Sequence, residues 1–251
     1  MLDLVLRLLG WRALLFTGDP CVFDRWRWLR AHLGRGPLRT FDAGAGNGAF
    51  SIYAAKCGNE VLAASFSEDE LTAARLRARA LGIEAVQFRV IDLRELDRHS
   101  TDLGSFDQII CLETIEHVRD DEGLMHALAS LLRPGGRLLL STPFDGHRPL
   151  YTEDPSPSPV EDGSHVRYGY SRARLAQIAR DAGLEVGAEE FISGVISQRL
   201  TNLMRRLSVR FGRPVAWLAL APLRWLVVLD APVSALLRYP SLSVALVATK
   251  P

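Results

Sequence analysis

The stretch LRTFDAGAGNGA, residues 38–49, restricts the folds open to this chain more than any other. An apolar strand runs into a turn that carries three glycines, and a segment with helical spacing follows. Glycine permits positive φ angles and lets a backbone approach a ligand closely. A strand that passes into a helix through such a turn is typical of α/β domains that bind a nucleotide-like cofactor.

The segments that follow alternate between strands and helices. After an expected strand at 60–65, Ser67 and Glu70 form a capping box that begins a helix, and Gly82 ends it. A further helix is expected from about Asp121 to Leu132. Helices between strands require crossover connections, so we expect a parallel sheet that is covered on both faces. The other expected strands are AVQFRVID, FDQIICL, RLLLSTP, the end of SRARLAQIARDAGLEVGAEEF, and SLSVALVATK.

The glycine turn matches two cofactor-binding patterns. Gly44, Gly46 and Ala49 satisfy the dinucleotide fingerprint G-x-G-x-x-G/A, which would indicate an NAD(P)-dependent oxidoreductase. Asp42, Gly44, Gly46 and Gly48 satisfy the pattern D-x-G-x-G-x-G instead. A tight turn without any ligand is the third interpretation. Asp42 favours the second pattern, because the dinucleotide fingerprint has no acid two residues before its first glycine.

Four further motifs follow the glycine turn in order along the chain. IDL ends the third strand, FDQIICLETIEHV covers the fourth, LLRPGGRLLLSTP leads into the fifth, and HVRYGYSRARLAQIARDAGL follows a long polar loop. Together with FDAGAGNG, the set resembles the class I S-adenosylmethionine-dependent methyltransferases over about residues 38–190 and the final strand. The resemblance implies an α/β, Rossmann-like fold with a seven-stranded, mostly parallel sheet and helices on both faces. It also implies S-adenosylmethionine as the cofactor.

The resemblance further implies which residues hold that cofactor. Gly44 and Gly46 would pass beneath its methionine part, with Asp42 organising the turn. Asp92 would accept a hydrogen bond from the adenine amino group, and Phe66 would lie against the ring. Taken alone, Asp92 is equally a cap residue and Phe66 a core residue. The full implied set is Asp42, Ala43, Gly44, Gly46, Ser65, Phe66, Asp92, Leu93, Cys111 and Glu113.

The chain departs from this family at the end of the second strand. The family usually has an acid there that binds both ribose hydroxyls, whereas this chain has Ser65. Because a hydroxyl cannot make the charge-assisted pair, we expect weaker cofactor binding, with Glu68 as a substitute acid. The missing acid counts equally against NAD. It leaves open a catalytically inactive, methyltransferase-like protein that binds cofactor within a biosynthetic complex.

CLETIEHV, residues 111–118, follows the fourth strand at the sheet edge where α/β proteins bind ligands. Its E-x-x-E-H pattern is similar to O-methyltransferases of ubiquinone biosynthesis and to small-RNA 2′-hydroxyl methyltransferases, whose Glu and His residues are implicated in binding a divalent cation. That likeness implies metal ligands at Glu113, Glu116, His117 and His165. Without a metal, His117 or His165 would act as a general base. A structural role is the third interpretation. The metal is not favoured, because many class I methyltransferases without one carry EHV here.

Charge is spread unevenly along the chain, although the net charge is only +1. Residues 1–40 carry seven arginines against three aspartates, and residues 191–251 carry eight basic residues against the single Asp230. The segment between them is strongly acidic. Two basic ends on an acidic centre predict an anionic acceptor or an anionic membrane surface.

A basic and apolar insertion at 195–239 precedes the last strand. Its arginines at 199–213 have no acidic partner in the same segment, and VAWLALAPLRWLVVL follows them. That run has 15 residues and is interrupted by Pro222 and Arg224, so it is too short to span a membrane. We expect an interfacial helix or a helical cover over an apolar acceptor. Nucleic acid is not favoured as a partner, because no stacking motif accompanies the arginines.

We expect a single domain over residues 1–251, with a helical cover at 1–37, a cofactor-binding core at 38–142, a lid loop at 143–165 and the insertion at 195–239. The N-terminal MLDLVLRLLGWRALLF is expected to be an amphipathic helix and no signal peptide, because charged residues interrupt it. Cys21, Cys57 and Cys111 show no paired spacing, which favours a reducing, cytoplasmic location. The predicted activity is O-methylation of an apolar or lipid-linked small acceptor.

Overall fold

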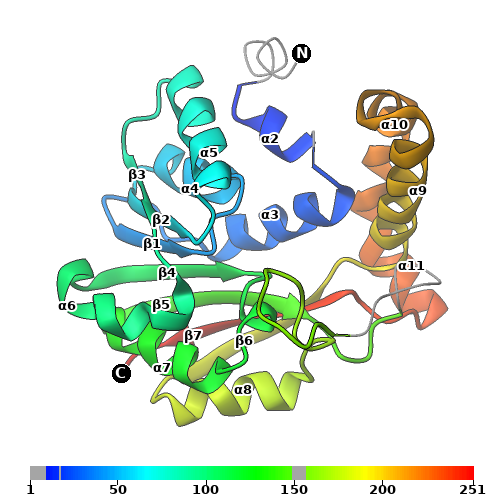
Figure 1. Cartoon of the computed structure of the whole chain (residues 1–251). Coiled ribbons are helices and arrows are strands. Elements are labelled where there is room, and N and C mark those ends of the chain that lie inside the picture. The colour runs from blue at the N-terminus through cyan, green and yellow to red at the C-terminus, as the bar shows by residue number, and fades with distance from the viewer. Residues whose placement is uncertain (1–9, 17, 149–156) are drawn as a thin grey trace.

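The computed structural model describes residues 10–16, 18–148 and 157–251. Its seven strands form one sheet in the order β3-β2-β1-β4-β5-β7-β6 (Figure 1). β7 runs in the opposite direction to the other six of these strands, which confirms the expected mostly parallel, seven-stranded sheet. The strands are β1 (Arg39–Ala43), β2 (Glu60–Ser65), β3 (Val86–Val90), β4 (Phe106–Leu112), β5 (Leu132–Pro143), β6 (Glu185–Ile192) and β7 (Ser243–Thr249).

Helices cover both faces of the sheet (Figure 1). One face carries α3 (Pro20–His32), α4 (Ala49–Lys56) and α5 (Glu68–Ala80), with the short α2 (Arg12–Phe16) packed on α3. The expected N-terminal helix extends over residues 1–9, which lie outside the described residues. The opposite face carries the 3-10 helix η1 (Leu93–His99), α6 (Ser100–Leu103), α7 (Asp121–Leu131) and α8 (Arg172–Asp181).

The helix boundaries follow the sequence signals closely. Ser67 caps α5 by accepting a hydrogen bond from the Glu70 amide (3.3 Å), and Gly82 has φ +63° just after the helix. Asp120 caps α7 by accepting from the Gly123 amide (2.9 Å). Both helices therefore begin and end within one or two residues of their predicted limits.

The insertion between β6 and β7 is helical, as expected. It consists of α9 (Val195–Phe211), α10 (Arg213–Leu220), η3 (Ala221–Leu229) and α11 (Asp230–Leu237). Gly194 precedes α9 and has no side chain to cap it, so Asp230 supplies the cap from α11. Its two carboxylate oxygens accept from the amides of Gly194 (2.7 Å) and Ile196 (2.6 Å). The beginning of α9 is thereby fixed to the beginning of α11.

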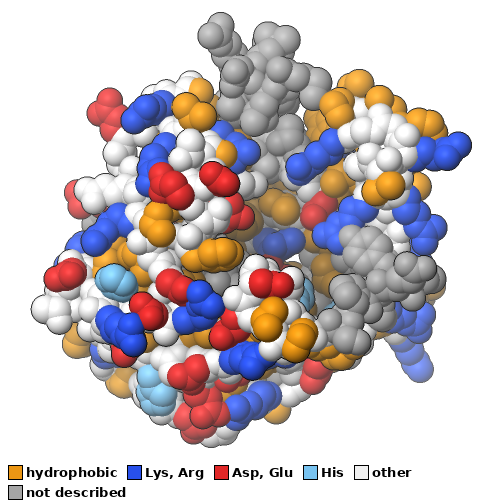
Figure 2. Space-filling view, in the orientation of Figure 1, with side chains coloured by type: hydrophobic (Ala, Val, Ile, Leu, Met, Phe, Trp, Pro, Cys, Tyr) orange, Lys and Arg blue, Asp and Glu red, His pale blue; other side chains and the backbone are white. Residues whose placement is uncertain are grey.

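The outer surface of the insertion is apolar and basic. Figure 2 shows hydrophobic side chains gathered over α10 at the upper right, with Lys and Arg side chains on either side. Arg213–Leu237 forms a 25-residue helical run that is long and apolar enough to cross a membrane by length and composition alone, so it is longer than the sequence suggested. Eleven of the seventeen exposed large hydrophobic residues in the described part of the chain lie here, namely Leu203, Val209, Phe211, Val215, Leu218, Leu223, Trp225, Val228, Leu229, Leu236 and Leu237.

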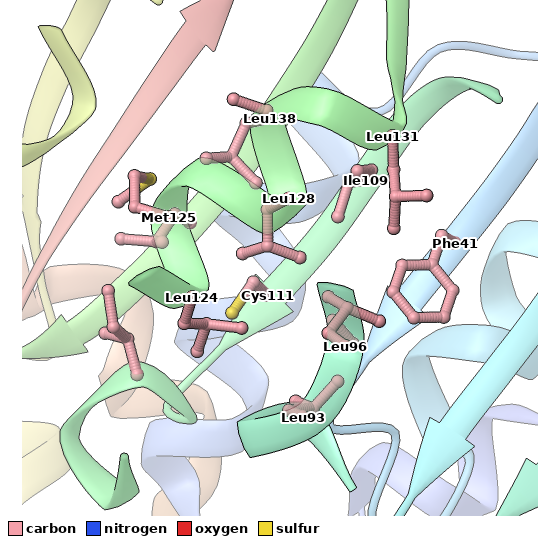
Figure 3. Packing of buried hydrophobic residues seen from close by; sticks show 14 of the residues in the cluster. Phe41, Leu93, Leu96, Ile109, Cys111, Leu124, Met125, Leu128, Leu131 and Leu138 are labelled. Carbon is pink, nitrogen blue, oxygen red and sulfur yellow. The ribbon is translucent and has the colours of Figure 1, made fainter. Parts of the chain in front are cut away.

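The alternation of side chains along the central strands builds a core on each face. Phe41, Ile109 and Cys111 belong to the core on the face of the sheet that carries α7, where Cys111 lies beside Leu124 and Leu128 and Phe41 lies beside Leu96 of η1 (Figure 3). The intervening positions of β4 and β5, Ile110 and Leu139 among them, belong to a second core beneath α3. Because period-two side chains are buried on both faces, the strand ends are held rigidly, and the loops that follow them are positioned accurately.

Candidate cofactor and acceptor site

The glycine turn after β1 is shaped by its neighbours. Gly44 has φ +91°, and a Cβ atom built on it would lie 2.3 Å from the Oγ1 atom of Thr114. Gly46 has φ +49°, and nothing lies within 4 Å of the position of its Cβ. The amides of Gly44 and Ala45 both donate to the Ala64 carbonyl, at 3.0 and 2.7 Å, which ties the turn to β2. The turn thus presents bare backbone to the space beyond the sheet edge.

Asp42 stabilises this turn from inside the protein. Its carboxylate is buried and accepts a hydrogen bond of 2.5 Å from the Ser51 hydroxyl of α4. Burial raises the pKa of Asp42 to about 6, although the hydrogen bonds from Ser51 oppose the shift. Asp42 therefore joins β1 to α4 and does not reach the cofactor side of the turn.

A cavity of about 360 Å³ opens in front of the glycine turn. It lies beyond the carboxyl ends of the first four strands, where open α/β sheets bind ligands. It is lined by Gly44, Gly46, Ser65, Phe66, Glu70, Asp92, Leu93, Arg94, Glu113, Thr114, His117, Val118, Glu161, Asp162 and Gly163.

Seven of the ten residues predicted to hold the cofactor line this cavity. The other three, Asp42, Ala43 and Cys111, do not, because their side chains are buried within the sheet and its cores. Cys111 packs in the hydrophobic core beneath α7, where burial raises the pKa of its thiol (Figure 3). The family resemblance implied Cys111 as part of the cofactor site, but the alternation of side chains along β4 turns its thiol into the core.

Asp92 and Arg94 form a close pair at the end of β3. The Asp92 carboxylate caps η1 by accepting from the Arg94 amide (3.0 Å), and the guanidinium of Arg94 binds both of its oxygens. The hydrogen bonds from Arg94 lower the pKa of Asp92. Arg94 also donates to the Glu161 carbonyl (3.1 Å), so the pair connects the sheet edge to the lid loop. Nothing in the sequence patterns pointed to Arg94.

The described part of the lid loop lies over the cavity. The carboxylate of Glu161 accepts from the Arg119 amide (2.8 Å), and the Val166 amide donates to the Glu116 carbonyl (3.0 Å). A Cβ atom on Gly163 would lie 3.1 Å from the ring of Phe66, so the loop backbone rests on that ring. Phe66 is 60% exposed and belongs to the cavity wall, which excludes the alternative that it is a core residue.

Glu113 connects the cavity to the far strands of the sheet. It has φ +51°, a conformation that residues other than glycine rarely adopt and that is concentrated at functional sites. Its carboxylate accepts from the hydroxyls of Ser141 on β5 (2.9 Å) and Ser243 on β7 (3.1 Å). These two hydroxyls hold the Glu113 side chain at the cavity wall and toward β5 and β7.

Glu116, His117 and His165 form a second polar group beside the cavity. The Oε1 atom of Glu116 lies 3.9 Å from the Nε2 atoms of both His117 and His165. The two imidazole rings meet edge to face, with centroids 4.6 Å apart. Glu116 is fully buried, and its other oxygen accepts from Thr142 (3.0 Å). The structure thus brings together three of the four predicted metal ligands, whereas Glu113 is turned elsewhere.

Burial and nearby charges shift the pKa of Glu116 within this group. Desolvation and the nearby Glu113 raise the pKa of Glu116 well above its usual value, whereas Arg25 on α3 lowers it. Burial of Arg25 lowers its pKa, but the nearby acids Glu113 and Asp19 outweigh burial, so the pKa is raised overall. Arg25 was predicted only as part of a basic N-terminal patch. The structure instead places its charge near the acids at the sheet edge.

This arrangement can accept a proton next to the cavity. His117 lines the cavity, and its Nε2 atom lies 3.9 Å from a buried oxygen of Glu116. An imidazole at this position can act as a general base toward a group held in the cavity. The same three residues offer two imidazoles and one carboxylate, a set that binds mid-row divalent cations. A hydroxyl group held at this end of the cavity would therefore meet either a general base or a metal-activating site.

The chain was compared with known proteins. A family model described as "Methyltransferase domain" matches residues 19–189 and ends before the insertion. A ubiquinone biosynthesis O-methyltransferase of Xanthomonas axonopodis pv. citri is 31% identical over 186 residues, which cover 72% of this chain and 75% of the relative.

Solved structures share the fold at low identity. An S-adenosylmethionine-dependent methyltransferase from Mesorhizobium loti aligns with a TM-score of 0.58 and 19% identity, covering 94% of this chain and all of that one. The [4+2]-cyclase SpnF aligns with a TM-score of 0.60 and 20% identity, over 90% of this chain and 80% of that one. Since SpnF is described as a cyclase, likeness at this level identifies the fold and leaves the reaction to the site.

Proposed function

Because the chain belongs to the S-adenosylmethionine-dependent methyltransferases, we propose that it methylates an oxygen atom of an apolar or lipid-linked small acceptor. The family membership replaces the dinucleotide interpretation of the glycine turn. The observation that carries the proposal is the group Glu116, His117 and His165 beside the cofactor cavity. A hydroxyl acceptor must lose its proton, and this group is placed to take it.

The cavity lining suits this cofactor. The bare backbone at Gly44 and Gly46 would hold its amino-acid part, while Phe66 and Asp92 would hold its adenine. When bound, the cofactor supplies a methyl group on a positively charged sulfur, and transfer then depends on alignment more than on covalent help. Lid residues 161–163 cover the cavity and would exclude water from it.

His117 acts as the general base in this proposal, and Glu116 packs beside it with its Oε1 atom 3.9 Å from the imidazole Nε2 atom. We expect His117→Ala to lower kcat by roughly 10²–10⁴-fold, the usual contribution of such a base. The affinity for S-adenosylhomocysteine should change less than about twofold. The assay is transfer of radiolabelled methyl groups into the lipid fraction of a lysate. The matched control is His126→Ala, because His126 is exposed on α7 and does not line the cavity.

The same assay decides between turnover and binding alone. If the wild-type protein binds the cofactor but labels no lipid, the proposed reaction is wrong, and a non-catalytic role in a biosynthetic complex takes its place. If His117→Ala and His126→Ala label lipid equally well, His117 is not the base.

A divalent cation is the second candidate for this group. The Glu116 oxygen that faces the two imidazoles is buried and accepts no hydrogen bond. Tetrahedral ligands of one ion with bonds of about 2.1 Å lie about 3.4 Å apart, so the separations of 3.9 Å would shorten by roughly 0.5 Å around an ion. Dialysis against a chelator tests it. Activity that is lost and then restored by Mn²⁺ or Mg²⁺ supports a metal, and full activity without metal excludes it.

The insertion supports an acceptor that lies in a membrane. Its apolar surface is flanked by exposed Arg206, Arg210 and Arg213, which fit anionic lipid headgroups. Arg224, in the middle of the apolar run, donates to the Gly18 carbonyl (2.7 Å) and holds the run against the protein body. We propose that the protein is cytoplasmic and that this surface lies on the membrane and does not cross it.

Vesicle cosedimentation tests this location. Leu218 is 65% exposed on α10, and Leu76 is 61% exposed on α5, so they form a matched pair. We expect Leu218→Ser to weaken binding to anionic vesicles about tenfold, because burial of the leucine side chain in the membrane contributes about 1.5 kcal/mol. Leu76→Ser should have no effect. Equal binding to anionic and neutral vesicles at low salt would contradict the proposal.

A further inference from the structure

A carboxylate from α5 lies next to the end of β2, and the sequence patterns did not reveal it. Ser65 is the last residue of the strand and is almost fully buried at the cavity wall. It stands where an acid is expected for a ribose, and it cannot form the charge-assisted pair with two hydroxyls. The question is whether another residue supplies that charge.

Glu68, the substitute suggested by the sequence, is in the wrong place. Its carboxylate accepts from Arg75 (2.6 Å) and from Thr72 (3.3 Å), both on the same helix. The hydrogen bond from Arg75 lowers the pKa of Glu68. Glu68 is also missing from the residues that line the cavity. It serves to stabilise the exposed side of α5 and cannot reach a ligand in the cavity.

Glu70 is in the right place. It lines the cavity, and its Oε2 atom accepts a hydrogen bond of 2.9 Å from the hydroxyl of Ser65. In a capping box, Glu70 would instead accept from the backbone amide of Ser67. Here that amide donates to the Oγ atom of Ser65 (3.2 Å), which fixes the Ser65 hydroxyl between the strand end and Glu70. The carboxylate is thereby released from capping and held at the cavity.

We propose that Glu70 is the residue that accepts hydrogen bonds from the two ribose hydroxyls of the cofactor, with Ser65 as the residue that positions it. The inference rests on the proposed function, because it takes S-adenosylmethionine as the ligand. A carboxylate has about four acceptor positions, and Ser65 occupies one of them. The acid of the ribose site has therefore moved from the strand to the first turn of the next helix. It follows that this chain binds its cofactor without the weakness that Ser65 alone predicts.

Calorimetry with S-adenosylhomocysteine tests the proposal. We expect Glu70→Gln to weaken binding about 10- to 100-fold, the usual effect of losing a charged hydrogen-bond acceptor. Glu68→Gln is the matched control, two residues away on the same helix and outside the cavity, and should change affinity less than about twofold.

The double variant Ser65→Asp/Glu70→Gln sharpens the test. Restoring an acid at the strand end should return most of the affinity that Glu70→Gln loses. Ser65→Asp alone places two carboxylates side by side and should weaken binding. A purely structural role for Glu70 predicts no rescue, and thermal melts would show a matching loss of stability.

A ligand that lacks one hydroxyl gives an independent readout. The wild-type protein should prefer S-adenosylhomocysteine over its 2′-deoxy analogue, and Glu70→Gln should lose most of that preference. If Glu70→Gln binds both ligands as the wild type does, or loses the same factor for both, this inference is wrong and the proposed function is untouched. If the wild-type protein binds neither ligand, the proposed function fails and this inference fails with it.

Discussion

The cofactor cavity takes its lining from loops that directly follow strand ends, whereas the helical insertion is held by side chains that reach across from another helix. In the cavity, Gly44, Ser65 and Asp92 each lie at the end of a parallel strand or within two residues of it. In the insertion, the first turn of α9 depends on Asp230, 36 residues away. The sheet therefore determines the geometry of the cavity, whereas contacts among the helices of the insertion determine the geometry of the insertion.

Changing the glycine turn should have the largest effect. In Gly44→Ala the new Cβ would lie 2.3 Å from Thr114 at φ +91°, so the turn must open. We expect cofactor affinity to fall more than about 100-fold and the free energy of unfolding to fall by about 2–4 kcal/mol. Calorimetry and urea denaturation measure both.

Gly82→Ala is the control for this variant. Gly82 also has positive φ, at +63°, but nothing lies within 4 Å of its Cβ position and it is outside the cavity. It should lose about 1 kcal/mol of stability and no cofactor affinity. Equal losses of affinity in both variants would show that the cavity does not depend on this turn.

Removing the shared cap should affect the insertion alone. Asp230→Ala leaves the buried amides of Gly194 and Ile196 without their acceptor, so we expect a loss of about 3 kcal/mol. Amide exchange in α9 should rise, while cofactor affinity stays within about twofold. Asp69→Ala, which removes an exposed acid from the first turn of α5, should cost less than about 1 kcal/mol. A large loss of cofactor affinity in Asp230→Ala would contradict the separation of the two regions.

The pH dependence of the free energy of unfolding gives a smaller difference between the two regions. Asp24 is buried between α3 and the insertion, and burial and Asp230 raise its pKa to about 6, against opposing effects of Ser197 and Arg27. Because the unfolded pKa lies near 3.8, this group favours the folded state fully below about pH 4. That contribution to the free energy of unfolding, about 2–3 kcal/mol, declines as the pH rises and is lost above about pH 6.

Asp24→Asn should therefore gain about 2–3 kcal/mol relative to the wild type between pH 4 and pH 7. Urea denaturation at both pH values measures it. Asp42, whose pKa is also raised to about 6, is the matched buried acid behind the glycine turn. Asp42→Asn should also make the free energy of unfolding less dependent on pH, and it should weaken cofactor binding. Asp24→Asn should leave the cofactor affinity unchanged. A pH profile of Asp24→Asn that parallels the wild type would exclude this assignment.

The sequence predicted the sheet and the strand-end residues, because both depend on local patterns. Gly44, Asp92 and Glu113 line the cavity as predicted, since each follows a strand directly. Glu70 was missed because the capping-box pattern assigned its carboxylate to the backbone of Ser67, and only the Ser65 hydroxyl reveals otherwise.

Longer-range contacts could not be predicted in the same way. Arg94 contacts the lid loop 67 residues away, at Glu161, and no sequence pattern encodes that separation. The cap from Asp230 to α9 likewise depends on how the insertion folds back. Cys111 was included in the site by the family resemblance, whereas side-chain alternation along β4 directs it into the core.

The insertion starts and finishes at neighbouring points of the sheet. Ile192 on β6 pairs with Ser243 on β7, and the Leu242 amide donates to the Ser193 carbonyl (2.8 Å), so the two strands would form an ordinary hairpin if the insertion were removed. A hairpin of that kind closes with a two- to five-residue loop. The two ends of the insertion therefore lie side by side on the sheet, so the length of the insertion can vary without moving the strands whose ends form the cofactor cavity.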